Sequence, residues 1–227
     1  SPVFSVFGIN NLDDVLSFYQ TVYDLNIRYT GNLNICLGCY VDSDGNVDSA
    51  LNGGNLRSTG NPAIGIVAAI SSDDVDTSIS GTQHILVISK DDVSTGVAWS
   101  YYTSTNYGLN GETASVLMSG YNNTLIMKNK DGVYTRAAGM CWGKGIALTG
   151  NLTTQWFLPA RNQYKLMMES FGSWQFFFDQ VGMANAWYWI SNEYPGQVSR
   201  GLAWNNSGNL AASPSKSSSC RDRKSVV

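Results

Sequence analysis

The stretch WFLPARNQYKLMMESFGSW, residues 156–174, decides the fold. A helix is expected to begin directly after Pro159, because apolar side chains then recur every three or four positions. The pattern predicts a helix over residues 160–171, with Gly172 breaking or kinking it. The side expected to pack against a sheet holds Tyr164, Met167 and Phe171.

Strand patterns lie on both sides of this helix. The apolar runs 63–70 and 84–89 predict two strands, and Ile85–Ile88 is as continuous as a strand buried on both faces. Residues 113–148 predict a second helix followed by closely packed small residues. After residue 186, short apolar runs alternate with polar turns, which predicts hairpins. The sum is an α+β fold with two helices around small antiparallel sheets.

The N-terminal part differs from the rest of the chain in its pattern of apolar residues. Its apolar positions 12, 15, 16 and 19 have the spacing of a short amphipathic helix. We interpret residues 1–37 as an appendage, a possible assembly segment. Residues 38–227 are interpreted as one compact domain, with residues 38 and 222 close together.

The composition is rich in loops and aromatic residues. Only 14% of the 227 residues are charged, while there are 23 Gly, 12 Tyr and 7 Trp. A net charge of -3 argues against a nucleic-acid binder, and Arg221, Arg223 and Lys224 are interpreted as a solvated tail. No apolar run reaches the length of a membrane span, so direct membrane insertion is not expected.

The cysteines and the single histidine predict no metal site and no cofactor. Cys36 and Cys39 have the spacing of half a zinc site or of a redox pair, but a second half is missing. They are interpreted as two partly buried thiols on an apolar strand, 35–41. The disulfide status of the four cysteines stays open: Cys36, Cys39, Cys141 and Cys220. His84 is expected to be a structural residue, since no nucleophile motif accompanies it.

An acidic alternation, Asp42-x-Asp44-x-Asn46-x-Asp48, has two interpretations. It is similar to the start of a calcium loop. However, Val47 stands where that loop needs glycine, and Gly53 stands where it needs a bidentate glutamate. The preferred interpretation is a polar hairpin turn.

Several segments occur in the order found in one known family. They are PAIGIV (62–67), HILVIS (84–89), GYNNT (120–124), AAxxC (137–141), WFLPA (156–160) with Leu166-Met167, YWISNEY (188–194), and an Asn/Ser/Gly-rich end. Together they resemble the C-type-lectin-fold variable proteins of diversity-generating retroelements, over roughly residues 38–222. The pair WFLPA and YWISNEY is the most specific part of the likeness.

The resemblance implies a C-type-lectin-like scaffold, related in shape to formylglycine-generating enzymes, with a variable region at about 182–220. Its implied role is receptor recognition, on a bacterial cell surface or a phage virion. The implied partner is a protein or glycan ligand on a cell surface, and a homo-oligomer is possible. Formylglycine-generating enzymes use a cysteine pair near the end of the domain. Only Cys220 lies late here, so no enzymatic activity is expected.

The candidate binding residues follow from composition and from codons. Binding surfaces favour rigid aromatic and small polar side chains. In addition, adenine-directed variation of asparagine codons cannot produce Trp, Glu, Gln, Lys or Met. Scaffold positions are therefore Trp189, Glu193, Gln197, Trp204 and Lys216. Candidate ligand-binding positions are Asn185, Tyr188, Ile190, Pro195, Val198, Ser199, Ala203, Asn205, Ala211, Ser213 and Ser215.

Two alternatives stay open. One is an adhesin or carbohydrate-binding lectin of fixed specificity on the same fold, although the Glu-Pro-Asn and Gln-Pro-Asp tripeptides of calcium lectins do not occur. The other is an enzyme of the formylglycine-generating type, a hydrolase or an oxidase. It is disfavoured because a nucleophile motif is missing.

Overall fold

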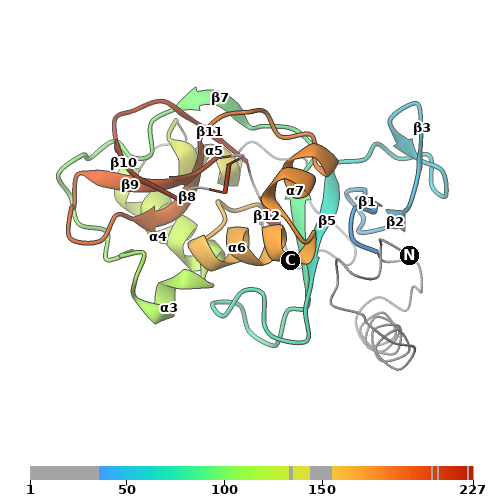
Figure 1. Cartoon of the computed structure of the whole chain (residues 1–227), viewed down its shortest axis with the longest axis horizontal. Helices are drawn as coiled ribbons and strands as arrows, with labels where there is room; N and C mark the ends of the chain where they lie inside the picture. Colours follow the sequence, from blue (N-terminus) through green and yellow to red (C-terminus); the bar gives the residue numbers. More distant parts are fainter. Residues whose placement is uncertain are drawn as a thin grey trace.

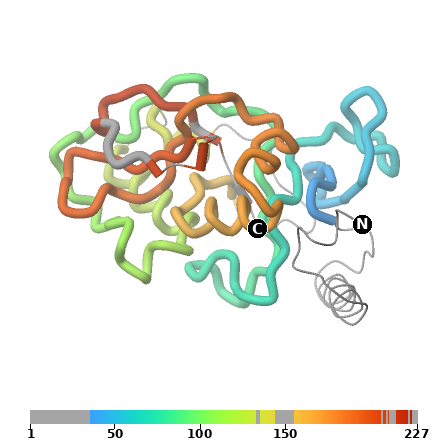
Figure 2. The backbone as a smooth tube through the Cα atoms, viewed as in Figure 1, coloured from blue at the N-terminus to red at the C-terminus, as the bar shows by residue number. Residues whose placement is uncertain are grey.

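The computed structural model describes residues 36–132, 135–143, 155–205, 207–208, 210–223 and 225–226. The appendage predicted for residues 1–37 therefore lies outside the described residues, except for its last two. Figure 1 shows the arrangement of the elements, and Figure 2 shows the course of the backbone between them.

The first sheet is built on the two strands that the sequence predicted. Strand β5 (Gly65–Ile70) pairs antiparallel with β6 (Ile85–Ser89). The outer strands are β1 (Tyr40–Val41), β2 (Val47–Asp48) and β12 (Ser225–Val226), in the order β12-β6-β5-β1-β2. The first and last described strands thus belong to one sheet. A separate small hairpin is formed by β3 (Leu51–Asn52) and β4 (Asn55–Leu56).

The second sheet contains the predicted hairpins after residue 186. Its strands are β8 (Tyr188–Glu193), β9 (Arg200–Trp204), β10 (Leu210–Ser215), β11 (Cys220–Asp222) and β7 (Ser94–Val97). The order is β10-β9-β8-β11-β7. The pairs are antiparallel except for β11 with β8, which is parallel.

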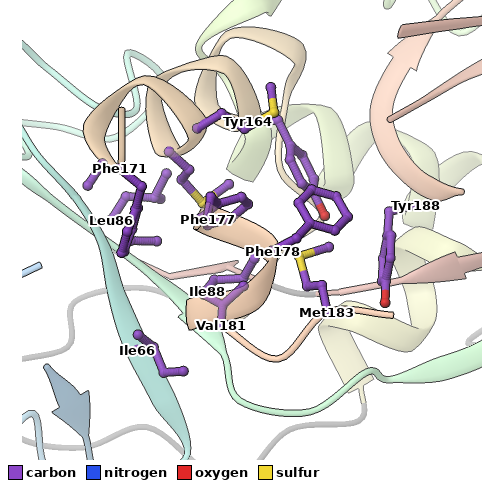
Figure 3. Packing of buried hydrophobic residues seen from close by; sticks show 14 of the residues in the cluster. Ile66, Leu86, Ile88, Tyr164, Phe171, Phe177, Phe178, Val181, Met183 and Tyr188 are labelled. Carbon is purple, nitrogen blue, oxygen red and sulfur yellow. The ribbon is translucent and has the colours of Figure 1, made fainter. Parts of the chain in front are cut away.

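The helix expected after Pro159 is confirmed. Helix α6 (Arg161–Ser170) begins where Gln163 Oε1 accepts a hydrogen bond from the Ala160 N–H at 2.8 Å. It ends before Gly172, whose φ of 77° is a conformation that glycine adopts readily, and α7 (Trp174–Gln180) follows. The predicted core-facing residues, Tyr164, Met167 and Phe171, are all buried in the main hydrophobic cluster. Figure 3 shows Tyr164 and Phe171 within it. This cluster draws residues from both sheets, so α6 holds the two sheets together.

The prediction of two helices is wrong, because the described residues contain five. The single helix predicted within residues 113–148 is three helices, α3 (Ala114–Leu117), α4 (Gly120–Asp131) and α5 (Ala137–Gly143), and α7 is the other addition. Helix α4 lacks an apolar stripe because polar groups occupy its buried face. Asn123 donates to Val116 O and Ser191 Oγ, and Thr124 Oγ1 donates to Gly120 O. Hydrogen bonds, not apolar periodicity, satisfy this face.

The acidic segment near the start forms the predicted hairpin turn between β1 and β2. Asp42 Oδ1 accepts hydrogen bonds from the backbone N–H groups of Asp44 (3.0 Å) and Asn46 (2.9 Å). Asp42 Oδ2 accepts from the side-chain amide of Asn61 at 3.0 Å. Burial favours protonation of Asp42, but these hydrogen bonds outweigh it and hold its pKa below the ordinary value. The carboxylate thus organises its own turn.

Two interpretations of single residues need correction. Cys36 and Cys39 are not thiols on a strand; they form a disulfide across a turn that precedes β1. Arg221 and Arg223 are not part of a solvated tail either, while Lys224 lies outside the described residues. Arg223 is fully buried and donates to the carbonyls of Ser89 and Val181, each at 2.6 Å. Arg221 donates to Asp92 at 2.5 Å. Composition alone does not reveal such partners, which come from distant parts of the chain.

Candidate binding face

Three of the candidate ligand-binding residues lie in the core. Tyr188, Ile190 and Ala203 are 0% exposed, so their prediction as surface residues is wrong. The reason is that both faces of the second sheet are covered. Tyr188 and Ile190 enter the main cluster, whereas Trp189 and Ala203 enter a second cluster. Every side chain of β8 is therefore buried.

The remaining candidates lie at opposite ends of the β8–β9 hairpin. Pro195, Val198 and Ser199 lie in the loop after β8, and Ser215 ends β10 beside Arg200. Val198, Ser199 and Ser215 are exposed and Pro195 is partly exposed.

Asn185 is exposed and Asn205 is partly exposed, and both lie near the other end, where Tyr188 pairs with Trp204. Strand rise places the two groups on the order of 15 Å apart, so they do not form one face. Ala211 and Ser213 belong to β10, but their side chains lie outside the described part.

Around Lys216, three loops meet. The backbone N–H of Lys216 donates to Ser199 O at 2.9 Å, and the Trp99 N–H donates to Lys216 O at 2.9 Å. We name residues 100–107, which follow Trp99, the tyrosine loop. The other two loops are residues 194–199 and 215–219. Segments far apart in the sequence thus form one surface.

A buried ion pair fastens these loops together. The Lys216 ammonium lies 2.6 Å from Glu193 Oε1, and both side chains are almost fully buried. Lys216 Nζ also donates to Thr105 O at 2.7 Å. It lies 4.8 Å from the ring centroid of Trp99 and 4.6 Å from that of Tyr107. Burial lowers the pKa of Lys216, while the hydrogen bond and charge of Glu193 act in the opposite direction.

Two buried carboxylates hold the two ends of the tyrosine loop. Glu193 accepts hydrogen bonds from the Tyr107 N–H at 3.0 and 3.1 Å and from the Leu109 N–H at 3.0 Å. Asp131 Oδ1 accepts from Tyr107 Oη at 2.5 Å and from Ser100 Oγ at 2.9 Å. Such networks make the loop a rigid support.

What the loops expose is an aromatic pair with small polar neighbours. Tyr101 is 57% exposed and Tyr102 is 47% exposed, and their rings lie at 81° with centroids 5.0 Å apart. We call these rings, together with the exposed side chains of the three loops, the binding face. Its other members are Thr103, Ser104, Asn106, Gln197, Val198, Ser199, Ser215, Ser217 and Ser219.

Tyr101 and Tyr102 are not among the ligand-binding residues predicted from the sequence. The stretch SYYTSTNY, residues 100–107, has the same aromatic and small polar composition that marked the later candidates. It lies outside the predicted variable region, and only the tertiary structure brings it beside that region.

Burial confirms three of the predicted scaffold positions. Trp189, Glu193 and Lys216 are buried, and the Trp189 indole donates to Val97 O at 2.7 Å. Trp204 is only partly buried, and Gln197 is exposed. Being unreachable by adenine-directed variation therefore does not by itself imply a buried position.

The opposite end of the β8–β9 hairpin carries a cavity of about 530 Å³. Phe178 and Met183 contribute its apolar lining, and Asp92 and Arg221 contribute an ion pair. Asp92 also accepts a hydrogen bond from Tyr188 Oη at 3.1 Å. Of the charged residues that line the cavity, Asp92 and Arg221 are thus engaged with each other.

The two cysteines outside the disulfide are in environments that disfavour reactivity. Cys141 and Cys220 are buried, and burial raises the pKa of the Cys220 thiol to about 12. A thiol with this pKa holds almost no nucleophilic thiolate at neutral pH. Within the described residues, no group of three His, Cys, Asp or Glu side chains is placed to hold a metal ion.

Comparison of the sequence with protein families and with curated proteins gives no match. A crystal structure of a fimbrial protein from Bacteroides ovatus ATCC 8483 is similar in fold, with a TM-score of 0.53 and 16% sequence identity. The match covers 85% of this chain and 48% of that chain, so this chain spans about half the length of the fimbrial protein. At this identity the likeness shows the fold alone.

Proposed function

We propose that this chain is a non-enzymatic, surface-displayed ligand-binding protein with a C-type-lectin-like fold. Its ligand is a protein or glycan on a cell surface, bound at the binding face. The observation that carries the proposal is the exposed Tyr101–Tyr102 pair, held on a loop that a buried ion pair and a carboxylate network immobilise. Rigid aromatic side chains bind at a low cost in conformational entropy.

Two further observations support a surface location, on a bacterial cell or a phage virion. The Cys36–Cys39 disulfide is typical of oxidising compartments outside the cytosol. The fold is shared with a fimbrial protein. Among the helices of the described residues, none has the length and apolar character needed to span a membrane.

A diversified face, as implied by the variable proteins of retroelements, is the finer form of this proposal. The exposed candidates Pro195, Val198, Ser199 and Ser215 would vary, while Tyr101 and Tyr102 would stay constant. The alternative is an adhesin of fixed specificity. It is favoured by the position of the tyrosine pair outside the predicted variable region.

The test uses two libraries displayed on yeast. One randomises Pro195, Val198, Ser199 and Ser215; the other randomises the buried Tyr188, Ile190 and Ala203. We expect protease-resistant, folded protein throughout the first library and rarely in the second.

Members of the first library are then sorted on a panel of bacterial cells. Altered cell preference supports a diversified face. Unchanged preference, together with loss of binding in the Tyr101→Ala/Tyr102→Ala variant, supports fixed specificity. If neither library nor tyrosine variant changes binding to any cell, the recognition role is wrong.

A further inference from the structure

The charges around the tyrosine loop have a sign opposite to that of the whole chain. The chain carries a net charge of -3, yet residues 100–107, 194–199 and 215–219 contain no Asp or Glu. Two cations flank the tyrosine loop. Lys130 donates to Asn106 O at 3.0 Å, and the Arg136 guanidinium lies 5.5 Å from the Tyr101 ring centroid.

Carboxylates near this surface are already engaged. Glu193 is buried against Lys216 at 2.6 Å. Asp131 is 5% exposed, and its Oδ1 accepts hydrogen bonds from Ser100 and Tyr107. Within the described residues, no carboxylate forms an ion pair with Arg136. Lys130 and Arg136 thus place positive charge beside the binding face, and the two carboxylates described here, Glu193 and Asp131, are buried.

The neutral part of the face suits a sugar ring. The perpendicular rings of Tyr101 and Tyr102 offer an apolar surface for the C–H face of a pyranose. Exposed hydroxyls of Thr103, Ser199 and Ser217 lie on the three adjoining loops and are able to donate to and accept from sugar hydroxyls. Aromatic area with a few polar groups is the usual composition of a specific ligand site.

The number of cationic side chains at this surface is too small for binding a nucleic acid. A polynucleotide presents a phosphate at every residue and is bound by a track of many Lys and Arg side chains. Lys216 beside the tyrosine loop is buried against Glu193, which leaves Lys130 and Arg136 as the cations described there for a ligand, and the chain as a whole repels a polyanion. A single carboxylate or sulfate on a sugar matches this charge.

From the proposed function and these observations, we infer that the binding face takes an acidic glycan, a saccharide carrying a carboxylate or sulfate. Arg136 forms a charge-assisted hydrogen bond with the acidic group, while Tyr101 and Tyr102 contact the sugar ring. The shared chemistry is an anionic pyranose, and the probes below distinguish carboxylate from sulfate.

The experiment measures binding of the full chain by calorimetry to four probes. They are trigalacturonate, its methyl ester, a κ-carrageenan tetrasaccharide (sulfated, without carboxylates) and a single-stranded DNA hexamer. We expect trigalacturonate or the sulfated tetrasaccharide to bind at least about tenfold more tightly than the neutral ester, the value of one charge-assisted contact. Added salt should weaken binding of the acid but not of the ester.

Variants assign the two contributions. Arg136→Gln should abolish the preference for the acid and leave affinity for the ester unchanged, and Arg136→Lys should restore part of the preference. Tyr101→Ala should weaken binding of both sugars. Two matched controls lie outside the binding face: Lys165→Gln, at an exposed cation of α6, and Trp187→Ala, at an exposed aromatic near the other end of β8. Both should bind like the wild type.

The inference is overturned if neither acidic sugar binds more tightly than the neutral ester, if Arg136→Gln has no effect, or if no sugar binds at millimolar concentration. Tighter binding of the DNA hexamer than of both acidic sugars also overturns it, because the ligand class is then wrong. The proposed function fails separately, if the wild type and the Tyr101→Ala/Tyr102→Ala variant bind all bacterial cells equally.

Discussion

Replacing Lys216 by Met should destabilise the protein by about 3–5 kcal/mol, the usual cost of removing one partner from a buried ion pair. Methionine keeps the packing against Trp99 and Tyr107 but leaves the Glu193 carboxylate buried without its cation. Glu193 retains hydrogen bonds only from the Tyr107 and Leu109 N–H groups. These do not replace a charge partner at 2.6 Å.

Equilibrium unfolding in urea measures the loss, and thermal unfolding should show a Tm lower by roughly 6–20 °C for a chain of this size. The double variant Lys216→Met/Glu193→Gln should recover about 1–3 kcal/mol, since it removes the uncompensated charge and keeps one acceptor. The control is Lys165→Met, which breaks an exposed pair with Glu169 and should cost less than about 0.5 kcal/mol. If the free energy of unfolding of Lys216→Met lies within about 1 kcal/mol of the wild-type value, Lys216 does not fasten the three loops.

Three other predictions concern the core, the tyrosines and metal removal. Trp189→Ala should lower the free energy of unfolding by about 3–5 kcal/mol, measured by chemical denaturation. Trp187→Ala, at an exposed position, should lower it by well under half of that amount. Burial, followed by the charge of Asp92, raises the pKa of Tyr188 to about 12, and burial also raises the pKa values of Tyr107 and Tyr164. Because the unfolded chain loses these protons near pH 10, stability should fall as pH rises from 10 towards 12. Absorbance at 295 nm should reveal at least three tyrosines that ionise only on unfolding, and complete ionisation of the native protein at pH 11 contradicts this. EDTA should leave the Tm unchanged, since the backbone N–H groups of Asp44 and Asn46 hold the Asp42 carboxylate without a metal ion. A fall in Tm of several degrees on adding EDTA contradicts this prediction.

The elements that the sequence predicted well are those whose side chains contact an apolar core in a regular way. Helix α6 and strands β5 and β6 were recognisable because period and burial coincide. A helix was also predicted within residues 113–148, but the bounds of α4 were not, because Asn123 and Thr124 occupy its buried face through hydrogen bonds and leave no apolar period.

The candidate site was predicted only in part, for a different reason. The codon argument concerns which amino acids a gene can reach, whereas burial depends on what covers a strand. Glu193 and Lys216, which it assigned to the scaffold, are buried, but the candidates Tyr188, Ile190 and Ala203 are buried too, because β8 and β9 are covered on both faces. The tyrosine pair was missed because proximity across about a hundred residues of chain is a tertiary property.

The contacts of the buried Arg223 predict that folding during synthesis waits for the residues around it. Its guanidinium satisfies carbonyls of Ser89, Lys90 and Val181, and β12 completes the first sheet beside β6. A nascent chain therefore exposes an unpaired sheet edge and unsatisfied carbonyls until these late residues leave the ribosome. A product that stops before Lys216 lacks both fastenings and is exposed to proteases. Truncation between residues 182 and 216 is therefore expected to prevent folding, although at residue 216 both sheets already have most of their strands.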